Sequence, residues 1–192
     1  MRTQSHTQPE PSRPMPHNIE IKARIDPGQL DEIRNRAAEL SGGPPTVLHQ
    51  LDTFFHAPHG RLKLREFGDG TGELIAYERP DQRGPKHSEF VLAPTNDPTS
   101  LKDALTRALG VRGVVEKKRE LSLVGQTRVH IDEVRDLGPF LELEVMLTAG
   151  QSHADGAAIA EGLMDALEVS KNSLTARAYI DLLELGPLHP PC

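Results

Sequence analysis

The sequence predicts an α+β fold with eight mainly antiparallel strands and four helices. Three observations lead to this prediction. Eight short segments alternate apolar and polar residues and are separated by turn residues, as the strands of successive hairpins are. Four other segments carry apolar residues at helical spacing between start and stop signals. Finally, several strand candidates place charged residues on one face only, so the two faces of the sheet must meet different surroundings.

The helix signals are clear at both ends of most segments. Asp26 and Asp97 each precede a proline, which puts an N-cap carboxylate before a proline at the first helical position. Apolar residues then recur three and four positions apart until a glycine ends the pattern. A third helix begins at Ser152, where Asp155 completes a capping box. We expect a fourth helix over about residues 173–184.

Turn residues set the limits of the strands. Gly68-Asp69-Gly70 is a strong hairpin signal, and Gly125 and Gly138 separate the last three strands. Because neighbours along the chain are joined by short turns, we expect mainly antiparallel pairing. The strand candidates are residues 18–25, 46–56, 60–67, 72–79, 86–93, 112–124, 126–134 and 139–148.

Charged residues alternate with aliphatic ones along these strands. In the first strand, Glu20 and Lys22 share one face, and Ile19 and Ile21 lie on the other. The other polar faces are formed by Lys63 with Arg65, Tyr77 with Arg79, Lys117 with Arg119, Arg128 with His130 and Asp132, and Glu142 with Glu144. The early and middle strands therefore concentrate cations, and the last strand concentrates glutamates.

Two interpretations of these faces remain open from the pattern alone. They can be the solvent side of an antiparallel sheet, or they can line the lumen of a closed barrel, for which eight strands suffice. Carboxylates suit hard cations such as Mg²⁺ and Mn²⁺, and Arg and Lys complement phosphate oxygens. A lumen with both sets would match a metal-bound polyphosphate.

Composition excludes several functional classes. The net charge of −6 argues against a general nucleic-acid binder. No apolar run approaches the roughly 20 residues of a membrane span, and the N-terminus lacks the apolar region of a secretory signal, so we expect a cytoplasmic protein without a membrane partner. The single cysteine, Cys192, excludes a disulfide framework. The length suits one domain, expected over 18–185 between disordered tails at 1–17 and 186–192.

The motifs, in their order along the chain, resemble those of CYTH domains, the triphosphate tunnel metalloenzymes. This family includes class IV adenylate cyclases, thiamine triphosphatases and inorganic triphosphatases. Asn18-Ile19-Glu20-Ile21-Lys22 is similar to the family's N-terminal E-x-E-x-K signature. The further matches are Asp52-Thr53-Phe54-Phe55, Leu62-Lys63-Leu64-Arg65, Tyr77-Glu78-Arg79-Pro80, Lys117-Lys118-Arg119, His130-Ile131-Asp132, Phe140-Leu141-Glu142-Leu143-Glu144 and the segment from Ala178 to Leu183.

The resemblance implies an eight-stranded antiparallel β-barrel, a tunnel with helices packed outside, that binds a triphosphate and one or two divalent ions, Mg²⁺ or Mn²⁺. By position, the metal ligands would be Glu20, Glu142 and Glu144, with Asp132 nearby. The substrate-binding residues would be Lys22, Lys63, Arg65, Arg79, Lys117 and Arg119, of which Lys22, Arg65 and Arg119 are also the predicted catalytic residues. Tyr179 would lie near the tunnel mouth.

The implied function is metal-dependent processing of a small-molecule triphosphate. One reaction is the conversion of ATP to cyclic AMP and pyrophosphate, and the other is hydrolysis of an organic or inorganic triphosphate, such as thiamine triphosphate or tripolyphosphate. Two residues depart from the family. Asn18 stands where the signature has its first Glu, and we align His87 with a strand arginine. A non-catalytic triphosphate-binding module is therefore the alternative, and homodimerisation is left open.

Overall fold

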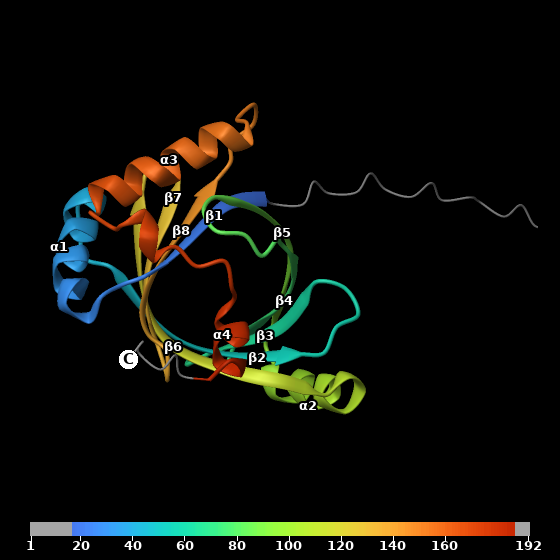
Figure 1. The fold of residues 1–192 in the computed structure, drawn as a ribbon. Coiled ribbons are helices and arrows are strands. Elements are labelled where there is room, and N and C mark those ends of the chain that lie inside the picture. Colours follow the sequence, from blue (N-terminus) through green and yellow to red (C-terminus); the bar gives the residue numbers. More distant parts are fainter. Residues whose placement is uncertain (1–16, 187–192) are drawn as a thin grey trace, which may run out of the picture.

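A computed structural model describes residues 17–186, in which eight strands close into one barrel with the helices α1 to α3 outside it (Figure 1). The predicted barrel and the antiparallel pairing are confirmed. The predicted tails over 1–17 and 186–192 lie outside the described residues, apart from His17 and Gly186, and so does Cys192. His17 is the first residue of a strand.

The strands follow the order β1-β5-β4-β3-β2-β6-β7-β8 around the barrel. Two runs of hairpins, β2 to β5 and β6 to β8, supply most pairings. Long-range pairs close the ring, because β1 lies between β5 and β8 and β2 lies beside β6. The strands are β1 (His17–Arg24), β2 (Thr46–Phe55), β3 (Arg61–Phe67), β4 (Gly72–Glu78), β5 (Lys86–Thr95), β6 (Val111–Val124), β7 (Thr127–Val134) and β8 (Gly138–Met146).

The helices begin at the predicted caps. Asp26 caps a 3-10 turn, η1 (Pro27–Gln29), that leads into α1 (Leu30–Ser41), and Asp97 caps α2 (Pro98–Leu109). The capping box of Ser152 and Asp155 opens α3 (His153–Ala166). The last two elements are the 3-10 turn η2 (Lys171–Ser173) and the short helix α4 (Tyr179–Glu184).

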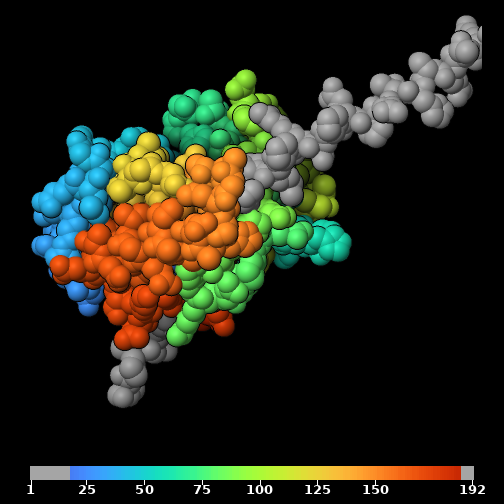
Figure 2. Space-filling view, turned by 90° about the horizontal axis from the view of Figure 1, so that it is seen from above, coloured from blue at the N-terminus to red at the C-terminus, as the bar shows by residue number. Residues whose placement is uncertain are grey.

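The main hydrophobic core lies outside the barrel, between its wall and the helices α1 and α3. Ile21 and Leu143 face outward from β1 and β8 and pack in one cluster with Ile33 of α1 and Met164 of α3. Figure 2 shows α3 lying across one side of the molecule, with α1 beside it. Side chains alternate across a strand, so the residues between these apolar positions point inward. The charged faces therefore line the lumen, and the solvent-face interpretation is wrong.

The segment before α4 corrects one prediction. The expected helix over 173–184 begins only at Tyr179, because the residues before it continue the barrel wall. Leu174 forms an antiparallel bridge with Ala23, and the backbone N–H of Thr175 donates to the carbonyl of Lys22 at 2.9 Å. A backbone that pairs with a strand cannot also form a helix.

α4 closes one end of the barrel. It is drawn within the outline of the barrel in Figure 1. Tyr179 and Ile180 pack in a second apolar cluster with Phe54, Val115 and Phe140, which are contributed by three different strands. Two arginines of the strands β3 and β6, Arg61 and Arg112, form ion pairs of 2.9 and 2.7 Å with Asp181 of α4.

Candidate active site

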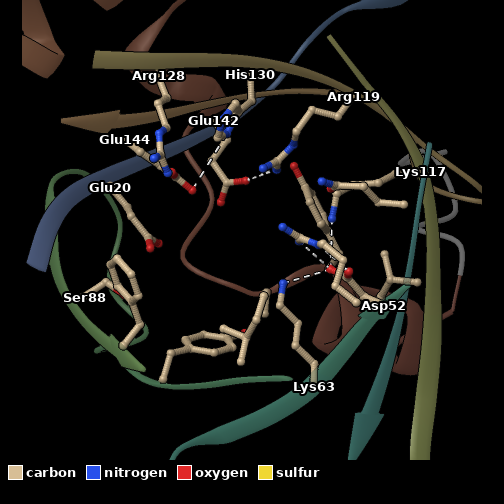
Figure 3. A pocket seen from close by; sticks show the side chains of 18 of the residues that line it. Glu20, Asp52, Lys63, Ser88, Lys117, Arg119, Arg128, His130, Glu142 and Glu144 are labelled. Carbon is tan, nitrogen blue, oxygen red and sulfur yellow. Dashed lines mark hydrogen bonds and ion pairs between the residues drawn. The ribbon is translucent and has the colours of Figure 1, made fainter. Parts of the chain in front are cut away.

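The lumen forms one cavity of about 480 Å³ that opens at the end opposite α4. Of the ten predicted site residues, nine line this cavity, and Asp132 lies behind them in the wall. Figure 3 shows two groups of side chains that face each other. Lys63 and Lys117 gather about Asp52 on one side, and His130, Glu142 and Glu144 lie together on the other.

Asp52 is the centre of the cationic group. The residue is 1% exposed, and its carboxylate accepts hydrogen bonds from Lys63 at 2.8 Å, Arg65 at 2.7 and 2.8 Å, and Lys117 at 3.1 Å. Three cations thus share one counter-ion inside the barrel. Burial would raise the pKa of Asp52, but Arg65, Lys117 and Lys63 hold it well below its usual value. The sequence interpretation noted Asp52 only as part of a motif and assigned it no role.

Burial and the neighbouring cations also shift the pKa of Lys117. Burial, together with repulsion from Arg65 and Arg119, lowers the pKa of Lys117 to about 7, against the attraction of Asp52. An ammonium with so low a pKa gains more from a nearby phosphate than an exposed lysine does, because water and its single counter-ion stabilise it poorly. Lys117 is therefore suited to bind an anion.

Arg119 connects the two groups. Its guanidinium donates to both carboxylate oxygens of Asp132 at 2.7 Å and to Glu142 at 2.6 Å. Asp132 also accepts a 2.9 Å hydrogen bond from the hydroxyl of Tyr179. Both oxygens of Asp132 are thus occupied by protein donors. These contacts orient Arg119, and the role of Asp132 as a metal ligand stays a prediction.

Lys22 and Arg79 complete the predicted cations on the β1 side. The Lys22 ammonium lies 3.3 Å from Glu142 and 3.7 Å from the centre of the Tyr179 ring, so the aromatic face supports its charge. Arg79 donates to Glu20 at 3.1 Å. Glu20 and Glu144 are directly paired across β1 and β8, which brings the first and last predicted metal ligands to neighbouring strands.

One compact group offers ligand atoms to a metal ion. One atom each from His130, Glu142 and Glu144 lie within 4.8 Å of one another. Burial raises the pKa of Glu144 to about 7, with Glu142 adding repulsion. Burial would also raise the pKa of Glu142, but Lys22 and Arg119 hold it well below its usual value. A divalent ion fits such a group, because it would neutralise two adjacent carboxylates in a buried site.

The lumen face of β5 differs from the prediction. His87 was aligned with a tunnel arginine, but it pairs with Ile19, whose side chain belongs to the outer core, and its ring stacks on His153 at 4.4 Å. Ser88 lines the cavity, and Lys86, which is buried, lies two residues before it on the same face of β5. Burial lowers the pKa of Lys86 to about 8, with Arg79 and Lys22 adding repulsion. Counting alternate residues from Phe90, whose ring is inward, would have found Lys86.

Apolar side chains surround the open end of the cavity. Exposure rises toward this end, to 44% at Leu92 and 62% at Leu123. The ring, called the apolar collar below, consists of Leu48, Phe67, Phe90, Leu92, Leu121 and Leu123. Arg128 stands beside it, 3.7 Å from Glu144. The cavity thus has a charged interior and an apolar entrance.

The family model of the CYTH domain matches residues 16–179. This chain belongs to the CYTH domain family. The match covers the whole barrel and ends at the first residue of α4, so the CYTH domain includes every predicted site residue. None of the helices described for this CYTH domain has the length and apolar composition that a bilayer crossing requires.

Solved structures share the fold. The PH1012 protein from Pyrococcus horikoshii OT3 matches with a TM-score of 0.74 and 23% identity, over 86% of this chain and 98% of that chain. HpAC1 from Hippeastrum, described as a putative adenylyl cyclase with a dominant triphosphatase activity, has a TM-score of 0.66 and 17% identity, over 90% and 98%. The Mimivirus capping enzyme triphosphatase has a TM-score of 0.55 and 11% identity, over 79% and 89%. No curated protein matches the chain.

Proposed function

We propose that this CYTH domain binds a triphosphate in its tunnel and hydrolyses it with the help of a divalent metal ion. The observation that carries the proposal is the separation of charge across one cavity, with cations about Asp52 facing the carboxylates of β8. Seven lysine and arginine side chains and five carboxylates line the cavity. This excess of positive charge, increased by a divalent ion, suits a polyphosphate.

The proposed division of labour follows the contacts. Lys63, Arg65 and Lys117 hold phosphate oxygens from one side, preorganised by Asp52. Lys22 of β1, Arg79 just after β4 and Arg119 of β6 line the same cavity and would reach the same phosphates. Such a fixed set of donors lowers the barrier to phosphoryl transfer mainly by positioning and by stabilising the charge of the transition state.

Glu142 and Glu144 would hold the metal ion, with Glu20 on the adjacent strand. The bound ion would supply Lewis acidity toward a phosphate oxygen and a lower pKa for a water molecule. Asn18 lines the same cavity and has a buried side-chain oxygen without a hydrogen-bond partner among the described residues. An amide oxygen also ligates hard cations, so replacing the family's first Glu leaves a neutral donor in place.

Hydrolysis is preferred over cyclisation because it needs only water beyond the metal ion and the groups that line the tunnel. Cyclisation of ATP also needs the ribose 3′-hydroxyl directed at the α-phosphorus. The similar structure from Hippeastrum, described as a putative cyclase with a dominant triphosphatase activity, supports this preference by analogy. The apolar collar favours an organic triphosphate over an inorganic one, since burying a ring or an alkyl group there removes apolar surface from water.

The test is to incubate the purified chain with tripolyphosphate, ATP or thiamine triphosphate, each with Mg²⁺ or Mn²⁺. Release of phosphate supports the proposal. Formation of cyclic AMP from ATP would instead identify the chain as a cyclase. If calorimetry detects triphosphate binding but no product forms, the alternative function holds, and the chain is a non-catalytic binding module. Leu123→Ser should weaken binding of the organic substrate and leave tripolyphosphate binding unchanged.

A further inference from the structure

The candidate metal ligands on β7 and β8 include a histidine, His130, which is not among the carboxylates proposed above as metal ligands. His130 is 3% exposed, and its Nδ1 has no hydrogen-bond partner among the described residues. A buried polar atom without a partner costs free energy. The nearest acidic oxygen, on Glu144, lies 3.8 Å from this nitrogen, which is too far for a hydrogen bond. The space between them suits an ion.

The strand register fixes this arrangement. His130 pairs directly with Glu142 across β7 and β8, and Glu144 is the next inward residue on β8. The three side chains therefore project side by side into the lumen from two hydrogen-bonded strands (Figure 3). Glu142 can keep its bonds to Arg119 and Lys22 while it ligates an ion, because a carboxylate has about four acceptor positions.

From these contacts we infer that His130 is a nitrogen ligand of the tunnel metal, with Glu142 and Glu144 as the oxygen ligands, and that the site prefers Mn²⁺ over Mg²⁺. Mg²⁺ favours oxygen donors in near-ideal octahedral geometry, whereas later divalent ions also accept imidazole. The inference deepens the proposed function, on whose metal requirement it rests. It can still be tested without any triphosphate.

The first test measures Mn²⁺ binding to the wild-type chain by loss of the free-ion electron paramagnetic resonance signal, with Mg²⁺ as competitor. We expect Mn²⁺ to bind at least about tenfold more tightly than Mg²⁺. Electron spin echo modulation of the bound Mn²⁺ should contain the coupling of a directly ligated ¹⁴N nucleus. Bound Mn²⁺ without this coupling, or no Mn²⁺ binding at all, would overturn the inference.

The second test uses His130→Gln, which should lose the nitrogen coupling and about tenfold or more of the Mn²⁺ affinity, with little change for Mg²⁺. His49→Gln is the matched control, because His49 is exposed on the outer face of β2. Unchanged Mn²⁺ affinity in His130→Gln would identify His130 as a structural residue whose nitrogen binds water. If the variant does not fold, the nitrogen coupling of the wild-type chain still decides.

These readouts also separate the inference from the proposed function. Nitrogen-coupled Mn²⁺ binding without hydrolysis of any triphosphate would support the metal site and contradict the hydrolase. Conversely, hydrolysis with Mg²⁺ and Mn²⁺ alike, from a chain whose bound Mn²⁺ lacks the nitrogen coupling, would support the hydrolase and contradict His130 as a ligand.

Discussion

Arg119 donates to Glu142 over 2.6 Å, so the predicted phosphate-binding and metal-binding groups of the tunnel are in direct contact. Lys22 approaches the same carboxylate at 3.3 Å, and Arg79 approaches Glu20 at 3.1 Å. Each of these ion pairs joins one candidate phosphate ligand to one candidate metal ligand. Substrate and metal would therefore bind to groups whose positions are already coupled.

Replacing both carboxylates should separate folding from turnover. In Glu142→Ala with Glu144→Ala, we expect metal-dependent triphosphate hydrolysis to fall by about a hundredfold or more, because the metal loses its oxygen ligands. The chain should still fold, since Arg119 keeps both hydrogen bonds to Asp132, but with a lower free energy of unfolding, because buried Lys22 loses its ion pair with Glu142. Phosphate release and circular dichroism check both parts. Glu116→Ala, on the outer face of β6, is the control, and equal activity in the double variant would contradict the site.

Arg65→Ala tests whether the cations about Asp52 bind phosphate. We expect the dissociation constant for metal-free tripolyphosphate to rise by about ten- to a hundredfold, since a guanidinium makes strong, paired hydrogen bonds to phosphate. Isothermal titration calorimetry measures the change. Arg83→Ala, in the exposed loop before β5, should bind as the wild type does. An unaltered dissociation constant for Arg65→Ala would remove this residue from the site.

Asp52→Asn should destabilise the barrel from within. Lys63, Arg65 and Lys117 would lose their shared counter-ion in a buried site, so we expect the free energy of unfolding to fall by about 3–5 kcal/mol. Tripolyphosphate should restore part of this loss, because it brings negative charge to the same cations. Urea denaturation with and without tripolyphosphate measures both effects. Asp103→Asn, exposed on α2, should change stability by less than about 0.5 kcal/mol.

Triphosphate binding should be linked to proton uptake at Lys117. The pKa of this lysine is about 7 in the free chain, and a bound phosphate would raise it by stabilising the ammonium. At pH 8 the complex should take up protons, and metal-free affinity should fall as the pH rises above 7. Calorimetry at pH 8 in two buffers of different ionisation enthalpy measures the uptake. Identical heats in both buffers would disprove the linkage.

Lys117→Arg provides the matched variant, because an arginine stays charged in both states. It should bind tripolyphosphate with reduced proton uptake. Some uptake should remain, since the pKa of Lys86 is about 8 in the same lumen and a bound phosphate would raise it too.

The contact between Tyr179 and Asp132 should contribute to stability. Tyr179→Phe removes a buried 2.9 Å hydrogen bond to a carboxylate, so we expect a loss of about 1–3 kcal/mol in the free energy of unfolding, measured in urea. The other tyrosine of the chain, Tyr77, has no such bond to Asp132 and provides the control as Tyr77→Phe. Equal stabilities of the two variants would contradict a structural role for the Tyr179 hydroxyl.

Much of the fold follows from local signals. The caps at Asp26, Asp97 and Ser152 are formed as predicted, because an N-cap depends on neighbouring residues alone. The inward direction of Glu142 follows from a period of two along its own strand. The error at His87 arose because its assignment rested on alignment and not on the alternation along β5.

The sequence by itself determined the eight strands, the period that separates charged from apolar side chains, and the ordered motifs of the CYTH family. Only the tertiary structure decided that the charged faces converge, that Asp52 organises three cations and that His130 joins two glutamates. It also decided that α4 closes one end, and that the residues before Tyr179 pair with β1 and so do not belong to the last helix. The physical reason is that the charged faces of the hairpins meet only when the barrel closes, and closure depends on strands far apart in the chain, through the pairs of β1 with β5 and β8 and of β2 with β6.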